Sequence, residues 1–344
     1  MYNILKKILF NMDAEVAHEA VVNLCHYFPH TANVLGRKHK DSDKFKLRVG
    51  SLDWTFPVGL AAGLDKNAFC YPFFSHLGFG AVEVGTVTPL AQVGNEKPRL
   101  FRLVQENSLR NSMGFNNLGS EVMHANLARL KHRVVPLGVN IGKNKSTPDD
   151  LAYEDYAKLY HGLNDSCDYI VINVSSPNTP GLRGHQTTEG LEQIINGLGK
   201  REEKDIYIKI APDLDVSTVL DICEVVKKHS LAGLIATNTT SIPELGTGGV
   251  SGSILYEKAR DIRLKCIDVL KETPEISLIG VGGFSNFEQM KEYWSSGGRA
   301  IQIYSSFIYK GPQFLREVEK NLEDEFLKYS VSNFEEYLVC LVRK

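Results

Sequence analysis

From residue 54 onward, short apolar runs alternate with segments of helical periodicity. Runs such as Tyr169-Ile170-Val171-Ile172 are β-branched and uninterrupted, which is typical of strands buried on both faces of a parallel sheet. Eight βα units close a (β/α)8 TIM barrel, so this α/β fold is our prediction, with an open doubly wound sheet as the alternative. The eight runs begin near Val58, Ala81, Leu137, Tyr169, Ile206, Gly233, Ser277 and Ala300.

The N-terminal stretch predicts two short amphipathic helices. Ile4, Leu5, Ile8, Leu9 and Met12 recur on one face of the first helix, opposite Lys6 and Lys7. Asp13 is a candidate N-cap for the second helix, which Pro29 ends. The hairpin either covers one end of the barrel or binds something else with its apolar face.

Three segments follow from these patterns. We expect the helical hairpin over 1–40, the barrel over 41–329 and a C-terminal tail over 330–344. In the tail, Phe334, Tyr337, Leu338 and Leu341 fall at helical spacing, which predicts a packing helix. The second and third strands are separated by a long gap, and we expect an extended loop there as a wall or lid of a site.

Composition narrows the class of protein. The 344 residues carry 39 Lys and Arg against 41 Asp and Glu, so no net charge favours nucleic acid as a partner. The six cysteines lie far apart, with no Cys-x-x-Cys and no cysteine–histidine cluster. A reduced, intracellular protein without a metal site is therefore expected. No segment has the length and apolarity of a membrane span, and the N-terminus lacks the features of a secretory signal.

Polar groups follow seven of the eight predicted strands. The carboxyl ends of parallel strands meet at one face of a barrel, where barrel enzymes build their sites. The run Asn173-Val174-Ser175-Ser176-Pro177-Asn178-Thr179-Pro180-Gly181 is the clearest case, because its prolines stiffen a loop of amides and hydroxyls. The other polar strand ends are 61–66, 85–86, 140–143, 237–239, 280–283 and 302–305.

Two features indicate a cofactor that carries negative charge. Lys209 alternates with isoleucines in 206–210, so its side chain points into the barrel. The alternative is that it extends from the strand end to water. A buried lysine needs an anion or strong acceptors, as a cofactor atom that becomes negative would supply. Gly252, Gly282, Gly283 and Ser305 follow the last strands, where barrels often bind phosphate through backbone N–H groups.

The chain resembles dihydroorotate dehydrogenase, and more closely its class 2, the quinone-dependent, membrane-associated branch. The resemblance covers roughly residues 1 to 320 in collinear order, although 241–249 is shorter than in many relatives. Its motifs are Ala-Ala-Gly-Leu-Asp-Lys at 61–66, Asn-Ser-Met-Gly-Phe-Asn-Asn at 111–117, Asn-Ile-Gly-Lys-Asn-Lys at 140–145, the 173–181 loop, Ile-Ala-Thr-Asn-Thr-Thr at 235–240 and Gly-Val-Gly-Gly at 280–283.

The resemblance implies an FMN-bearing barrel that oxidises dihydroorotate to orotate in pyrimidine synthesis. FMN would contact Ala62, Gly63, Lys66, Thr86, Asn140, Asn173, Lys209, Thr237, Gly252, Gly283, Tyr304 and Ser305. Dihydroorotate would contact Lys66, Asn111, Ser112, Met113, Gly114, Phe115, Asn173, Asn178, Asn238 and Thr239. This agrees with the residue types, because a cation suits the substrate carboxylate and amides suit its ring edge.

The family's catalytic base falls on Ser176, where soluble class 1 members carry cysteine, so serine favours class 2. A serine hydroxyl is a weak base and must pass its proton onward, by way of Thr179 or a water. The alternative is that Ser176 only caps the turn. A class 1 enzyme that uses fumarate or NAD, a non-redox phosphate-binding barrel and a membrane-bound binding protein are the competing functions.

For the hairpin, the resemblance implies a tunnel that leads a membrane quinone to the flavin. His18, Arg102 and Tyr304 are the candidate quinone residues, although a lone histidine is more often a satisfied core residue. Lys6 and Lys7 suit the surface of an anionic lipid bilayer. The implied location is peripheral, on the cytoplasmic face of the inner membrane, and a monomer is expected.

Overall fold

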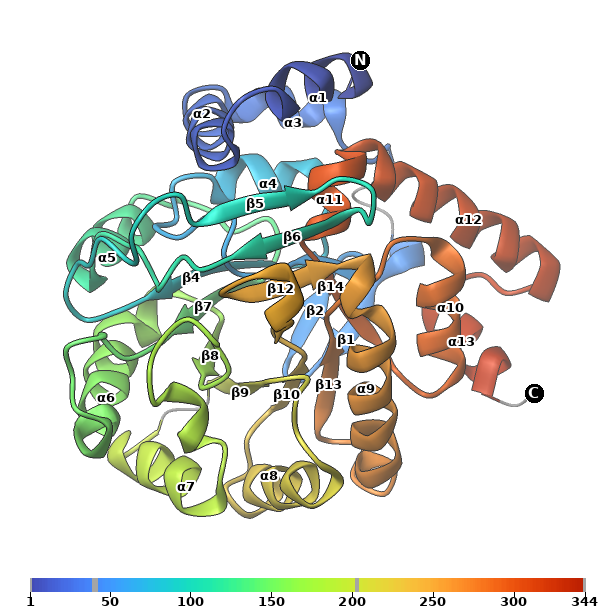
Figure 1. Ribbon diagram of the computed structural model, residues 1–344. Coiled ribbons are helices and arrows are strands. Elements are labelled where there is room, and N and C mark those ends of the chain that lie inside the picture. The colour runs from blue at the N-terminus through green and yellow to red at the C-terminus, as the bar shows by residue number, and fades with distance from the viewer. Residues whose placement is uncertain (1, 39–42, 202–203, 343–344) are drawn as a thin grey trace.

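The computed structural model describes residues 2–38, 43–201 and 204–342. Among them, eight parallel strands close a barrel in the order β10-β13-β14-β3-β4-β7-β8-β9, so the predicted TIM barrel is confirmed and the open sheet is wrong (Figure 1). All eight begin at or next to the predicted positions. Their bounds are β3 Val58–Leu60, β4 Val82–Val87, β7 Leu137–Ile141, β8 Tyr169–Asn173, β9 Asp205–Ile210, β10 Gly233–Ala236, β13 Ser277–Gly280 and β14 Ala300–Ile303.

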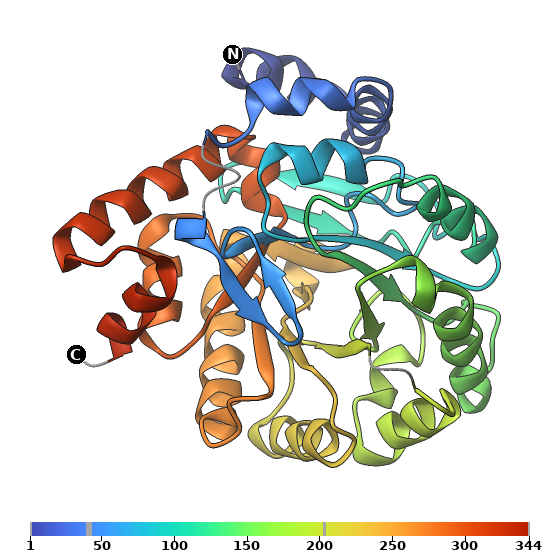
Figure 2. The ribbon, with the colours of Figure 1, turned by 180° about the vertical axis from the view of Figure 1, so that it is seen from behind.

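Helices surround the barrel, as Figure 2 shows from behind. The strands are apolar without alternation because their outward residues pack on these helices while their inward residues fill the barrel. The outer helices are α4 Tyr71–Leu77, α5 Ser120–Ala128, α6 Ala152–Leu163, α7 Thr188–Gly197, α8 Val216–Lys228, α9 Tyr256–Leu270, α10 Phe287–Ser295, α11 Ser305–Lys310 and α12 Gln313–Tyr329. Short 3-10 turns lie at Pro29–Thr31, Asp43–Phe45, Asp149–Leu151, Asn164–Ser166, Leu182–His185, Pro243–Leu245 and Ser253–Leu255.

The amino ends of the strands are closed by an antiparallel pair, β1 (Leu47–Val49) and β2 (Leu52–Trp54). The turn between them donates from Gly50 N to Ser277 Oγ at 2.8 Å and from Ser51 N to Asp205 Oδ2 at 2.7 Å. Those acceptors stand at the starts of β13 and β9. The carboxyl ends therefore form the opposite face, where a site can open.

A second sheet covers that opposite face. Its antiparallel order is β11-β12-β6-β5, with β5 Leu100–Leu103, β6 Ser108–Asn111, β11 Thr240–Ser241 and β12 Gly249–Gly252. Figure 1 shows it across the barrel mouth. The expected long loop after the second strand is thus wrong in form, because residues 100–111 within it form the hairpin β5–β6, which pairs with β12 beyond β10. The short 241–249 segment is the connection between β11 and β12.

The N-terminal helices α1 (Tyr2–Phe10), α2 (Ala14–Tyr27) and α3 (Ala32–Leu35) lie above this sheet (Figure 1). Asp13 caps α2 as predicted, since its side chain accepts from the backbone N–H groups of Glu15 and Val16. Ala14, Ala17 and Cys25 of α2 are buried, and α2 contacts β5 and α4. No helix of the described residues is long and apolar enough to cross a membrane.

Several large apolar side chains of this hairpin are exposed. Ile4 is 70 % exposed, Ile8 59 % and Val34 79 %. Lys6, which the pattern groups with Lys7 on the polar face, is instead partly buried, with Nζ 5.2 Å from the Phe10 ring centroid and 5.3 Å from that of Tyr309. A cation–π position inside the protein thus replaces the solvated position expected for Lys6.

The C-terminal tail forms helix α13 (Phe334–Val342). Phe334 and Tyr337 are fully buried, and the Phe334 ring packs edge-on against Trp294 of α10 at 5.1 Å between centroids. The boundary expected at residue 40 and the last two residues of the tail lie outside the described residues.

Candidate active site

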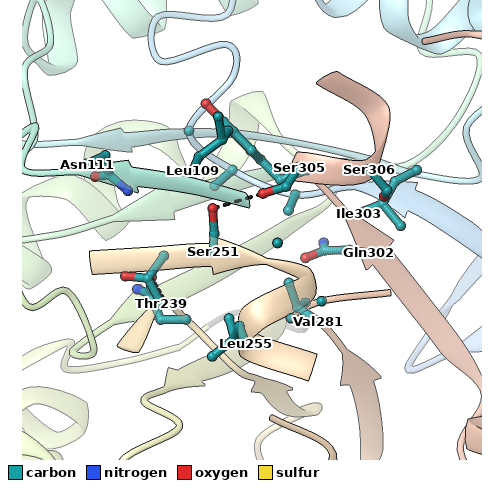
Figure 3. A pocket seen from close by; sticks show the side chains of 18 of the residues that line it. Leu109, Asn111, Thr239, Ser251, Leu255, Val281, Gln302, Ile303, Ser305 and Ser306 are labelled. Carbon is teal, nitrogen blue, oxygen red and sulfur yellow. Dashed lines mark hydrogen bonds between the residues drawn. The ribbon is translucent and has the colours of Figure 1, made fainter. Parts of the chain in front are cut away.

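A cavity of about 460 Å³ opens between the carboxyl ends of the barrel strands and the covering sheet (Figure 3). It brings together residues from six of the seven predicted polar strand ends, and Lys209 of β9 joins them. Those for the cofactor are Ala62, Gly63, Lys66, Thr86, Asn173, Lys209, Thr237, Gly252, Gly283, Tyr304 and Ser305. Those for the substrate and the base are Asn111, Met113, Gly114, Phe115, Asn178, Asn238, Thr239 and Ser176.

Three of the predicted residues do not line this cavity: Asn140, Ser112 and Arg102. Asn140 is fully buried behind Thr86 and Asn173. Ser112 continues β6, where its backbone N–H donates to Arg99 O at 2.8 Å. Arg102 donates to the Met12 and Leu9 carbonyls at 2.8 and 3.1 Å, so in this structure it holds the turn between α1 and α2.

A chain of buried amides connects the cavity wall to the barrel interior. Asn173 Nδ2 donates to Thr86 Oγ1 and to Asn140 Oδ1, both at 3.0 Å. Asn140 Nδ2 in turn donates to Glu83 Oε1 at 2.8 Å. Each amide therefore has a fixed orientation, because its donor and acceptor ends are held by different partners.

Lys209 pairs with Glu83, a residue that sequence reasoning missed. Both are buried, and Lys209 Nζ lies 3.3 Å from Glu83 Oε1. Gln302 Nε2 donates to the other carboxylate oxygen at 2.8 Å. The interpretation of Lys209 as a strand-end lysine that extends to water is therefore wrong. Glu83 could have been identified from the sequence, since it is the single charged residue in the buried strand Val82–Val87.

The loop after β8 holds Ser176 in the cavity wall. Ser176 is 5 % exposed, and its Oγ accepts the backbone N–H of Asn178 at 3.2 Å. Ser175, which was not predicted as a site residue, is fully buried and accepts from Asn238 Nδ2 at 3.0 Å. Its own hydroxyl donates to Asn173 Oδ1 at 3.0 Å, so this loop fixes two of the predicted substrate amides.

At the end of the cavity that holds the predicted substrate residues, a cation and several amides converge. Asn178 Nδ2 donates to Asn111 Oδ1 at 3.0 Å, and Lys66 Nζ donates to Asn116 Oδ1 at 2.8 Å. Burial lowers the pKa of Lys66 to about 8, although Glu15 acts in the opposite direction. A bound carboxylate would restore the charged form, so this lysine is suited to an anionic ligand.

At the other end, hydroxyls and glycines form a different lining. Ser251 and Ser305 share a hydrogen bond of 2.8 Å, drawn as a dashed line in Figure 3. Gly252 and Gly283 have φ of +96° and +80°, and a Cβ on Gly283 would come within 2.5 Å of Tyr256 Cα. This backbone turns its N–H groups in a way that side-chain-bearing residues rarely allow, which fits a phosphate.

Two buried atoms in the same wall have no hydrogen-bond partner among the described residues: Gln302 Oε1 and Ser306 Oγ. Figure 3 shows both side chains beside the Ser251–Ser305 pair. Unpaired buried polar atoms are costly, and a ligand in the cavity would supply partners for these two. The wall thus fits a polar ligand that hydrogen-bonds to Gln302 and Ser306.

The hairpin contributes to the same cavity. His18 of α2 and Tyr304 line it, as does Lys6, which was not predicted there. Burial lowers the pKa of His18 to about 4, and the Lys66 cation adds to this shift. Near pH 7 the imidazole is therefore neutral, with one N–H donor and one acceptor nitrogen.

Comparison with known proteins gives consistent results. The family model for dihydroorotate dehydrogenase matches residues 45–326. The chain is 40 % identical over 339 residues to the dihydroorotate dehydrogenase (quinone) of Idiomarina loihiensis, covering 94 % of this chain and 100 % of that protein. It is 41 % identical to the protein of the same name from Nitratiruptor sp., covering 95 % of each. A DHODH crystal structure from Eimeria tenella, in complex with ferulenol, superposes with a TM-score of 0.83 at 32 % identity and covers 93 % of each chain.

Proposed function

Because this chain belongs to the dihydroorotate dehydrogenase family, in its quinone-dependent class, we infer that it oxidises dihydroorotate to orotate, with a quinone as electron acceptor, in pyrimidine biosynthesis. The observation that carries this is the convergence in one cavity of Ser176, the Lys66 cation and the amides Asn111, Asn178 and Asn238. The class 1 alternative loses support, since the relatives carry the name of the quinone enzyme.

We assign the cofactor as FMN. Its phosphate would be held by Ser251, Ser305 and the backbone around Gly252 and Gly283, and its ring would lie toward Lys209. When bound, FMN would accept a hydride from the substrate and pass the electrons to the quinone. The buried pair of Lys209 and Glu83 keeps a cation at a fixed position in the wall, where it stabilises negative charge without reorganisation of water.

The proposed base, Ser176, has one feature that helps a weak base. The backbone N–H of Asn178 donates to its Oγ, and a donor to a hydroxyl oxygen stabilises the negative charge that grows there as the proton leaves. Lys66 and the amides hold the substrate, so that Ser176 removes the proton from the carbon next to the one that loses the hydride. The buried Thr179 lies in the same loop and is the proposed onward acceptor of the proton.

The test is an anaerobic titration in two steps. Purified protein loaded with FMN should bleach on addition of dihydroorotate and regain its colour with a short-chain quinone. Ser176→Ala should retain FMN and its reoxidation by quinone, while flavin reduction slows by about 10²–10⁴-fold. Ser176→Cys, which restores an ionisable group, should recover much of the rate. Normal reduction in Ser176→Ala removes this residue from the role of base.

The proposal extends to the second substrate and to the location. The exposed apolar residues of α1 to α3, among them Ile4, Ile8 and Val34, support peripheral binding to a bilayer, with the cavity next to His18, Lys6 and Tyr304 as the route for quinone. We assign it to the cytoplasmic face of the inner membrane. Deletion of the hairpin should abolish vesicle binding and quinone reduction while dihydroorotate still bleaches the flavin. Loss of both half-reactions would mean that the hairpin is only a lid.

A further inference from the structure

One arginine outside the cavity bridges two loops that line it. Arg183 follows the Ser176 loop, and its Nε donates to the Ser175 carbonyl at 3.0 Å. Its Nη2 donates to the Thr239 carbonyl at 2.7 Å. Each carbonyl stands at a proposed site residue: the Ser175 carbonyl is in the peptide that leads to Ser176, and the other carbonyl is that of Thr239, a proposed substrate residue.

The third donor of the guanidinium is held by Asp213, in the loop after β9. Arg183 Nη1 lies 2.7 Å from Asp213 Oδ2, and both side chains are about three-quarters buried. The other carboxylate oxygen accepts from Thr240 Oγ1 at 2.6 Å and from Lys258 Nζ of α9. The loops after β8, β9 and β10 are thus joined through one planar group, and neither Arg183 nor Asp213 lines the cavity.

We propose that Arg183 is a positioning residue, whose guanidinium fork holds the Ser176 loop against the Asn238–Thr239 segment and so fixes the base relative to the substrate. This inference rests on the proposed function. A guanidinium suits the task because its donors point in fixed directions within one plane and can serve three acceptors at once. A lysine keeps the charge but presents a single ammonium on a flexible stem, so it cannot hold both carbonyls and Asp213 in the same geometry.

The expected effect falls on one half-reaction only. A displacement of about 1 Å between a base and its substrate costs about 10²-fold in rate, so Arg183→Lys should slow flavin reduction by dihydroorotate by about that factor. Reoxidation by quinone uses the side of the cavity lined by His18, Lys6 and Tyr304, to which Arg183 makes no hydrogen bond, so it should be unchanged, as should FMN content. Guanidinium ions added to Arg183→Ala should restore part of the rate of flavin reduction, because they replace the missing guanidinium group.

The matched control is Arg133, whose ion pair with Asp168 at 2.5 Å has similar exposure, 31 % and 26 % against 26 % and 28 % for Arg183 and Asp213. Asp168 accepts from the backbone N–H of Leu137, where β7 begins, so this pair lies at the opposite end of the barrel. Arg133→Lys should leave both half-reactions unchanged.

Stopped-flow absorbance under anaerobic conditions measures each half-reaction separately. Slowed reduction with normal reoxidation in Arg183→Lys, with a normal Arg133→Lys control, supports the inference. Unchanged reduction in Arg183→Lys overturns it, and so does an equal loss of reduction, reoxidation and FMN content, which marks a merely structural role. If dihydroorotate does not reduce the unaltered protein either, the proposed function itself fails, and this outcome is recognised because the Arg133→Lys control fails with it.

Discussion

One buried ion pair joins helix α2 of the N-terminal hairpin to the segment before β5. Arg99 Nη2 donates to Glu15 Oε1 at 2.8 Å, and Nε lies 3.1 and 3.2 Å from the two carboxylate oxygens. Both side chains are nearly inaccessible, at 6 % and 5 % exposure. Arg99 Nη1 donates to the Val93 and Asn95 carbonyls, so the guanidinium is held in the barrel whether or not Glu15 is present. We therefore predict that Glu15→Gln loosens the hairpin and leaves the barrel intact.

The size of the effect follows from the burial. Removal of one partner of a buried, hydrogen-bonded ion pair costs about 3–5 kcal/mol, because the remaining charge has lost its compensation. The other contacts of α2 are modest, since only Ala14, Ala17 and Cys25 are its buried apolar residues. Local opening of α2 should therefore become about 10²- to 4 × 10³-fold more frequent, at one factor of ten for each 1.4 kcal/mol.

Hydrogen exchange measured by mass spectrometry tests this directly. Peptides that cover α2 should exchange faster in Glu15→Gln, while peptides from β8 and β9 should not change. The control is Glu19→Gln on the same helix, because Glu19 is 57 % exposed and contacts Lys97 at 3.4 Å. Such a surface pair contributes about 0–1 kcal/mol. Equal exchange in the two variants would refute the reasoning.

The same ion pair predicts a dependence on pH. Burial by itself would raise the pKa of Glu15, but Arg99 and Lys97 outweigh it and lower the pKa below its usual range. A carboxyl whose pKa is lowered by folding stabilises the native state above the pKa of the unfolded chain, about 4.3, and loses this contribution as pH falls through the folded value. Exchange from α2 should therefore be independent of pH, after correction for its intrinsic rate, until the solution becomes acidic.

The remaining predictions concern a lysine and two glycines. Burial lowers the pKa of the Lys66 ammonium to about 8, so the affinity for orotate should weaken above that pH as the cation is lost. The perturbation of the flavin spectrum measures this affinity, and an affinity that does not change with pH would contradict the prediction. Gly283→Ala should reduce FMN affinity and the melting temperature, because its Cβ would lie 2.5 Å from the Tyr256 backbone at a φ of +80°; normal FMN content would argue against the assignment of the phosphate. Gly162→Ala, in the last turn of α6 with no atom within 4 Å of its Cβ, should instead stabilise the protein by up to about 1 kcal/mol in thermal unfolding, and a lower melting temperature would contradict it.

Local features of this protein could be predicted from its sequence. The start of β8 at Tyr169 follows from its own residues, because a strand buried on both faces favours a β-branched run. The N-cap at Asp13 is equally local, because the free N–H groups of the first helical turn need an acceptor side chain. Lys209 could be identified as a candidate site residue from its inward position on the strand alone. The gathering of strand-end residues into one cavity also followed, since parallel strands in a barrel all end on the same face.

Which residues far apart in the chain pair with one another could be known only from the tertiary structure. Glu83 and Lys209 are separated by 126 residues and Arg99 and Glu15 by 84, and nothing in either local pattern names the partner. The covering sheet was missed for the same reason, because β6 pairs with β12 across the barrel mouth in a register set by both strands. Sequence by itself determined which residues face inward and which end a strand, whereas the closed barrel decided which charges and backbones meet, because non-local pairing depends on how every intervening element packs.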